Sequence, residues 1–288
     1  MALADLIVDA CAARPHPLVA VRHEGSWGSA CKPQRFTCDD GALYSVKFIQ
    51  NRHGDGRGAF NEQVVALCGE LIGAPVPPVR LIEVPAALTD VMNRNPAAYL
   101  LDFAPQPGIH HGSKWMDDCS DRAGVEHVDE NRQRLGSLEV LYTWLICRSD
   151  HQLIYSNKTP REVYSVDHTT FLPGEFNWNA ASLLPEYAIV VPDASFQGKG
   201  LTDADRGPAL DRLRRVTEGE VAVVVSRPPD EWGYRLLTGS RSPSTSWLGA
   251  TVCSTTTSRP PPRWLPTHTH FFSTYPTPSG TSASTSGC

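Results

Sequence analysis

The stretch RFTCDDGALYSVKFI, residues 35–49, sets two runs rich in aromatic and β-branched residues on either side of Asp40 and Gly41. An Asp-Gly step between two such runs is a strong signal for a two-residue hairpin turn, because both turn positions need a positive φ that Asp and Gly tolerate. Alternation along the second run places Leu43, Ser45 and Lys47 on one side of the strand. The sequence therefore predicts an antiparallel hairpin with a lysine near its end.

The segments around this hairpin extend the same sheet-rich pattern. PLVAVRHE at 17–24 and VRLIEV at 79–84 are typical of strands. Between them, the stretch GAFNEQVVALCGELIGAPVPP at 58–78 repeats apolar residues at helical spacing and stops at Gly73, just before three prolines. Its apolar positions are Phe60, Val64, Leu67, Cys68 and Leu71. The predicted order is hairpin, helix and then an extended strand.

After Gly108 the pattern favours helices. Residues 128–150, VDENRQRLGSLEVLYTWLICRSD, carry an apolar stripe that predicts a long buried helix, and residues 204–232 add at least one more helix. The members of the stripe are Leu135, Leu138, Leu141, Tyr142 and Leu145. We therefore predict an α+β protein with a small antiparallel-sheet part at 1–107, which includes one helix, and a mainly helical part at 108–237.

The last 51 residues, 238–288, contain no Asp, Glu or Lys and are dominated by Ser, Thr, Pro and Gly. Such a composition cannot bury enough apolar surface to offset the entropy of the chain, which predicts a disordered tail. A shifted reading frame in the gene is a second explanation for so abrupt a change.

The composition of the chain argues against some classes of binding partner and cellular compartment. A net charge of -5 and a pI near 6.0 disfavour a surface built to hold nucleic acid or anionic lipid. The eight cysteines form no C-x-x-C pair, which favours free thiols in a reducing compartment. Asp5 and Asp9 interrupt the apolar N-terminal segment, and no run approaches the roughly 20 apolar residues that span a bilayer. We expect a cytoplasmic protein without a membrane segment.

Lys47 is the first candidate for chemistry. A lysine presented on a sheet supplies the compact positive charge that neutralises nucleotide phosphates, although a solvent-facing strand lysine has the same pattern. Upstream, HEGSWGSACKP at 23–33 supplies Gly25, Gly28 and Ser29 in a predicted turn whose backbone N–H groups could cover phosphates. The turn lacks the full G-x-G-x-x-G spacing, so the motif is weak.

Glu62, near the start of the predicted helix, is a possible carboxylate partner for Lys47. Projected at 100° per residue, it falls away from the centre of the apolar stripe. Periodicity therefore favours a solvated glutamate in the first turn, where the helix dipole stabilises a negative charge.

The second group of candidates follows the long helix. Asp150 comes directly after it, Asn157 lies seven residues later, and Asp167 ends the strand-like REVYSVD. These three side chains could converge at the mouth of one hairpin-like loop. Phosphoryl transfer uses one carboxylate to orient the attacking hydroxyl, while an amide oxygen and a second carboxylate hold magnesium.

Six stretches together resemble the HipA-like kinase family of bacteria, in the same order and over roughly residues 17–236. They are YSVKF, FNEQVVALCGELIGAPVPPVRLIEV, GIHHGSKWM, LEVLYTWLICRSDHQLIYSN, VYSVDHTTF and PPDEWGY. The resemblance implies a two-lobed protein-kinase-like fold, ATP and magnesium as cofactors, and transfer of phosphoryl groups to Ser or Thr of a protein. It also implies a toxin–antitoxin role and hence an antitoxin partner.

The same resemblance implies roles for single residues. Lys47 would contact the ATP phosphates with Glu62 supporting it, Asp150 would be the catalytic aspartate, and Asn157 and Asp167 would bind magnesium. The chain departs from related kinases after the catalytic aspartate, because His151 rather than arginine follows it and the stretch from there to Asn157 is unusually apolar. A pseudokinase that binds nucleotide without turnover therefore stays open.

A metal-dependent hydrolase is the remaining alternative. His110 and His111 follow a turn, and His151 and His168 each follow an aspartate, so histidine and aspartate could hold a transition metal. No H-E-x-x-H or comparable spacing is present. We expect His110 and His111 to lie in a surface loop near the nucleotide.

Overall fold

A computed structural model describes residues 3–29, 31–51, 56–121, 124–147, 152–178 and 193–232. Asp150 and His151 lie outside the described residues, as does the tail predicted at 238–288. The fold and the site below are therefore built from the rest of the chain. In that part, no helix is both long enough and apolar enough to cross a membrane.

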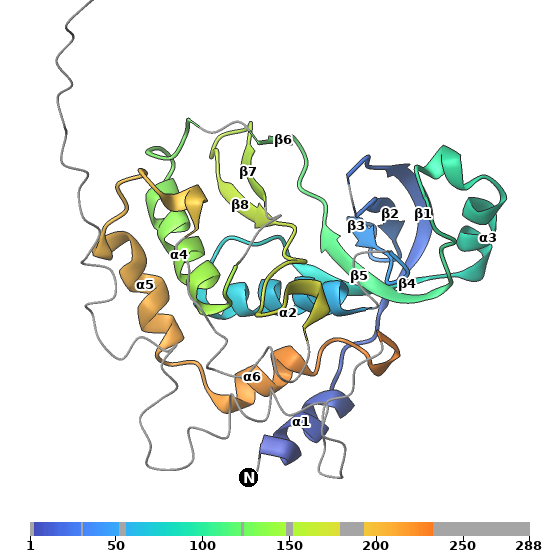
Figure 1. Cartoon of the computed structure of the whole chain (residues 1–288), viewed down its shortest axis with the longest axis horizontal. Coiled ribbons are helices and arrows are strands. Elements are labelled where there is room, and N and C mark those ends of the chain that lie inside the picture. Colours follow the sequence, from blue (N-terminus) through green and yellow to red (C-terminus); the bar gives the residue numbers. More distant parts are fainter. Residues whose placement is uncertain are drawn as a thin grey trace, which may run out of the picture.

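Five strands close into a barrel in the order β1-β2-β3-β5-β4 (Figure 1). The strands are β1 (Leu18–Ser26), β2 (Gln34–Cys38), β3 (Leu43–Lys47), β4 (Val79–Val84) and β5 (Gly108–Lys114). The predicted hairpin is confirmed, since β2 and β3 pair antiparallel from Thr37↔Leu43 to Gln34↔Val46. Its two-residue turn is wrong, because this register leaves three residues, 39–41, in the loop. Closure comes from a short parallel pairing of β1 with β4, which leaves no free edge on this sheet.

The prediction of a two-lobed kinase-like fold, with a small antiparallel-sheet lobe and a mainly helical lobe, is wrong. The described chain forms a closed barrel with helices and a second small sheet instead. Residues 108–114, assigned above to a helical part, form the strand that joins β3 to β4 inside the barrel. The reason is that alternation of apolar and polar residues can mark a strand, but nothing in the local sequence records which distant strand it pairs with.

Helices and a three-stranded sheet make up the rest. The helices are α1 (Leu3–Ala12), α2 (Arg57–Ile72), α3 (Ala86–Arg94), α4 (Asn131–Trp144), α5 (Asp203–Leu213) and α6 (Glu218–Val225). Short 3-10 turns are η1 (Pro96–Tyr99), η2 (Glu175–Asn177), η4 (Ala194–Phe196) and η5 (Asp230–Trp232). The second sheet has the order β6-β7-β8, with β6 (Cys119–Ser120), β7 (Gln152–Ser156) and β8 (Val163–Val166).

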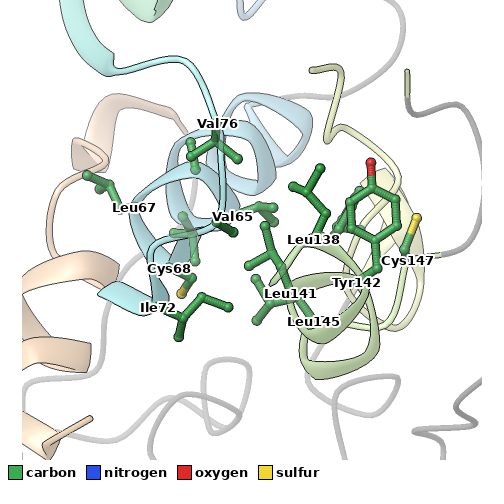
Figure 2. Packing of buried hydrophobic residues seen from close by; sticks show 14 of the residues in the cluster. Val65, Leu67, Cys68, Ile72, Val76, Leu138, Leu141, Tyr142, Leu145 and Cys147 are labelled. Carbon is green, nitrogen blue, oxygen red and sulfur yellow. The ribbon is translucent and has the colours of Figure 1, made fainter. Parts of the chain in front are cut away.

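Helix α2 lies at the centre of the molecule. It contacts β4 and β5 of the barrel as well as α4, α5 and α6. Its apolar side chains, among them Val65 and Ile72, pack with Leu138 and Leu141 of α4 in the larger core cluster (Figure 2). Because α2 is buried on nearly every side, its sequence carries no clear polar face. A separate cluster of buried apolar side chains fills the interior of the barrel.

Gly56 sets the start of α2. Its φ of +87° lies in the left-handed region, and a Cβ built on it would stand 1.9 Å from the carbonyl oxygen of Trp232. Only glycine avoids both the backbone strain and this overlap. The close approach fixes the entry of the helix that carries Glu62.

Candidate functional site

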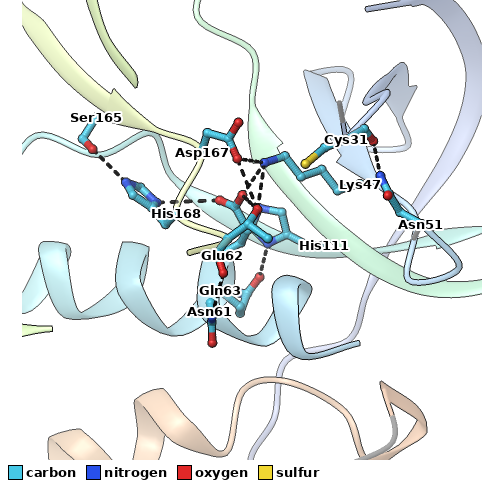
Figure 3. A network of polar contacts seen from close by, with 11 residues as sticks. Cys31, Lys47, Asn51, Asn61, Glu62, Gln63, His111, Ser165, Asp167 and His168 are labelled. Carbon is cyan, nitrogen blue, oxygen red and sulfur yellow. Dashed lines mark hydrogen bonds and ion pairs between the residues drawn. The ribbon is translucent and has the colours of Figure 1, made fainter. Parts of the chain in front are cut away.

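Three charged side chains from distant parts of the sequence meet at one point. The Lys47 ammonium donates hydrogen bonds to Glu62 of α2 and to Asp167, the latter at 2.6 Å (Figure 3). Thr169 joins them, with its hydroxyl oxygen 3.5 Å from Lys47 Nζ and its O–H donating to Glu62 Oε1 at 2.8 Å. The structure thus brings together the predicted lysine and two of the predicted acids.

The secondary structure explains this convergence. Lys47 ends β3, whose alternate residues Tyr44 and Val46 point into the barrel core, so the lysine projects from the opposite face. Asp167 directly follows β8 and has a φ of +63°. Aspartate tolerates a left-handed backbone better than most non-glycine residues, because its short polar side chain can hydrogen-bond locally. The turn that it makes ends the strand next to Lys47.

The three charged side chains differ in how far they are buried. The side chains of Glu62, Lys47 and Asp167 are 5%, 16% and 34% exposed, respectively. Burial disfavours the charge on Lys47, but the carboxylates of Glu62 and Asp167 outweigh it and raise the pKa of the amine. Burial likewise opposes the charge on Glu62, yet the Lys47 ammonium lowers the pKa of that carboxyl well below its usual range. Both groups are therefore held in their charged forms.

Glu62 corrects the prediction from periodicity. A solvated glutamate was favoured, whereas the structure buries Glu62 and pairs it with Lys47, as the family resemblance implied. Periodicity failed because α2 has buried residues all round and hence no solvent face to compare with. The sequence pattern does not show that other segments of the chain cover the side of α2 that carries Glu62.

A buried asparagine, which sequence reasoning missed, anchors the segment that follows Asp167. Asn61 is fully buried and donates to the carbonyl oxygens of Thr169, Phe171 and Glu175 at 2.7, 2.8 and 3.0 Å. Its own side-chain oxygen accepts from Trp178 Nε1. All four bonds join α2 to one stretch, so Glu62 and the segment after Asp167 are held as a unit.

Asn157 is not brought to this point. β7 and β8 pair with Gln152 opposite Val166, so Asp167 lies at one end of the hairpin while Asn157 follows the other end of β7. Five residues of strand separate Asn157 from Gln152, the partner of Val166, which places Asn157 about 16 Å or more from Asp167. There Asn157 is exposed and donates to Asp118 Oδ1 at 3.1 Å. Asp150, the predicted catalytic aspartate, lies outside the described residues.

The glycine-containing stretch lies in two different settings. Gly25 belongs to β1, opposite Arg35, and is therefore not part of a turn. Gly28 and Ser29 lie in the loop after β1. From the same loop the Cys31 thiol approaches Lys47 (Figure 3) and contacts Thr169. Burial raises the pKa of this thiol, while the nearby ammonium opposes the shift. No sequence signal marked Cys31.

The histidines of β5 are buried rather than placed in a surface loop. His110 and His111 are 0% and 1% exposed, and both are hydrogen-bonded, to the Gln106 carbonyl and the Gln63 side chain at 3.0 Å each. Burial lowers the pKa of both imidazoles to about 4. Among the described residues, no group of three or more His, Cys, Asp and Glu side chains is placed to hold a metal.

A magnesium–nucleotide complex needs fewer protein ligands than a metal ion that the protein binds alone. Mg²⁺ is commonly held by one or two carboxylates together with substrate phosphates, and it keeps several waters. Asp167 is a carboxylate with one third of its side chain exposed, next to an ammonium that could meet the phosphates. The residues present therefore fit such a complex, in which Asp167 would bind the metal ion and Asn157, beyond the other end of β7, would not.

The chain was also compared with known proteins. No protein-family model and no curated protein matches it. The resemblance to HipA-like kinases therefore rests on the sequence motifs alone and stays a prediction.

Proposed function

We propose that this protein is an ATP- and magnesium-dependent phosphotransferase that acts on a hydroxyl, most simply a Ser or Thr of a protein. The observation that carries the proposal is the Lys47 ammonium held between a buried carboxylate, Glu62, and a partly exposed one, Asp167. Such an arrangement presents a fixed positive charge beside a potential metal ligand, which is what a polyphosphate requires.

The residues divide the work. Glu62 keeps Lys47 charged and oriented, Lys47 neutralises phosphate oxygens, and Asp167 binds the metal ion. Magnesium bound there would neutralise charge that develops on the transferred group. Asp150 would orient the acceptor hydroxyl. A cytoplasmic location belongs to the same proposal, because it supplies ATP.

Labelled ATP tests the proposal. Full-length protein is incubated with γ-labelled ATP and magnesium, and transfer to itself or to a generic protein acceptor is measured. Lys47→Met and Asp167→Asn should each lower the rate by about 100-fold or more, since each removes a group that meets developing charge. Lys114→Met, which changes an exposed lysine at the end of β5, should leave the rate unchanged. Equal rates in Lys47→Met and the wild type would refute the proposal.

A nucleotide-binding protein without turnover is the second candidate. The position of Asn157 favours it, because the strand register places this residue, expected to be a second metal ligand, about 16 Å or more from Asp167. This candidate predicts that ATP raises the melting temperature of the wild type, does so less in Lys47→Met, and transfers no label. Absence of both a shift and transfer would exclude the two candidates together.

A further inference from the structure

Thr169 is bound to two neighbouring residues of α2, to one through its main chain and to the other through its side chain. Its carbonyl oxygen accepts from Asn61 Nδ2 at 2.7 Å, and its hydroxyl donates to Glu62 Oε1 at 2.8 Å. Thr169 itself is 6% exposed, and Asn61 is fully buried. The proposed function gives Thr169 no role.

The Asn61 amide fixes the backbone of Thr169. The indole N–H of Trp178 can only donate, and it lies 2.9 Å from one end of the amide, so that end is the oxygen. The NH₂ group therefore faces the carbonyl oxygens of Thr169 and Phe171, which can only accept. A displacement of Thr169 would break the shortest of the bonds that Asn61 makes. The Thr169 hydroxyl is thus carried on a backbone that α2 holds in place.

The Thr169 hydroxyl and the Lys47 ammonium contact the same two carboxylate oxygens. The hydroxyl oxygen lies 2.8 Å from Glu62 Oε1 and 3.2 Å from Asp167 Oδ1. Both of these oxygens also accept hydrogen bonds from the ammonium. The two acids are therefore bridged twice, once by a cation and once by a neutral hydroxyl.

The hydroxyl gives the acids support that does not come from Lys47. Ionised carboxylates only accept hydrogen bonds, so Glu62 and Asp167 cannot bond each other, and their like charges repel. The hydroxyl has one proton, which the shorter distance directs to Glu62. The position of Glu62 therefore does not depend on the ammonium alone.

We propose that Thr169 is a positioning residue, whose hydroxyl keeps the oxygens of Glu62 and Asp167 at a fixed spacing around Lys47. The ammonium and the carboxylate that would bind the metal ion are thereby held in one relative position before a magnesium–nucleotide complex arrives. This inference rests on the proposed function, because it concerns the same site.

Three substitutions separate the hydroxyl from the shape of the side chain. Thr169→Val keeps the shape without the hydroxyl, Thr169→Ala removes the hydroxyl without adding a methyl group beside the acids, and Thr169→Ser keeps the hydroxyl. The affinity of the full chain for magnesium and a non-hydrolysable ATP analogue is measured by calorimetric titration. Groups that orient a binding residue are worth about 10-fold to 100-fold, so the valine and alanine variants should each bind about 10-fold more weakly, and the serine variant within about 3-fold of the wild type.

Thr89→Val is the matched control. Thr89 is 0% exposed and its hydroxyl donates to the Ala86 carbonyl at 3.2 Å, within α3, which carries none of the site residues. Its affinity should equal that of the wild type. Equal affinities in Thr169→Val, Thr169→Ala and Thr89→Val would overturn the positioning role. An equal loss in Thr169→Ser and Thr169→Val would also overturn it, because the packing of the side chain rather than its hydroxyl would then matter.

The role of Thr169 and the proposed function fail in different ways. A wild-type protein that neither binds the analogue nor transfers label would refute the proposed function, and the role of Thr169 with it. A wild-type protein that binds and transfers, with Thr169→Val and Thr169→Ala binding as tightly, would refute the role of Thr169 alone.

Discussion

The unequal burial of the two acids around Lys47 predicts unequal costs for removing them. Glu62→Gln takes one partner from an ion pair whose side chains are 5% and 16% exposed. Breaking a buried pair in this way costs about 3–5 kcal/mol, because the remaining charge is left uncompensated. Asp167 still lies 2.6 Å from the amine, which places the expected loss at the lower end, about 3 kcal/mol.

Asp167→Asn should cost much less in stability. The Asp167 side chain is 34% exposed, so solvent screens its charge, and such pairs contribute about 0–1 kcal/mol. For a protein of this size, 1 kcal/mol corresponds to about 2–4 °C in Tm. We therefore expect Tm to fall by about 6–12 °C in Glu62→Gln but by no more than about 4 °C in Asp167→Asn.

Urea unfolding at pH 7, followed by tryptophan fluorescence, measures both variants. Glu83→Gln, an exposed glutamate on β4, is the control and should change the free energy of unfolding by less than about 0.5 kcal/mol. Equal losses in Glu62→Gln and Asp167→Asn would refute the argument from burial. A larger loss in Asp167→Asn would refute it more strongly. Under the proposed function, in contrast, phosphoryl transfer should depend more on Asp167, the residue proposed to bind the metal ion.

Two further predictions concern stability. Burial lowers the pKa of His110 and His111 from 6.5 to about 4, so the unfolded chain binds more protons in that window and stability falls as the pH drops from about 6.5 to about 4. Each histidine should lower the free energy of unfolding by about 2 kcal/mol between pH 7 and pH 5. In urea unfolding, His111→Gln should lose about half as much stability over this pH range as the wild type, whereas the exposed His16→Gln should lose as much as the wild type. A pH dependence in His111→Gln equal to that of the wild type would contradict this. Gly56→Ala should lose more than about 2 kcal/mol of unfolding free energy, whereas Gly41→Ala, at a similar positive φ but with open space around its Cβ, should lose about 1 kcal/mol. Similar losses in the two alanine variants would show that the close approach at Gly56 costs nothing.

Local elements were accessible from the sequence alone. The two runs around Asp40 and Gly41 predicted the hairpin, although its loop has three residues rather than two, and the helical spacing that ends at Gly73 predicted α2 nearly to its last residue, Ile72. The stripe that includes Leu138 likewise predicted α4. These elements depend on neighbours two to four residues apart, and such periodicities are written directly in the chain.

Only the tertiary structure decided how these elements meet. The parallel pairing of β1 with β4 closes the barrel, and no local pattern records it. The hydrogen bond from Lys47 to Asp167 joins residues 120 positions apart, while the register of β7 and β8 carries Asn157 away from both. The burial of Glu62 follows from packing around the whole of α2. The sequence by itself determined which charged groups were present, and long-range packing determined which of them touch, because burial and pairing depend on segments far apart in the chain.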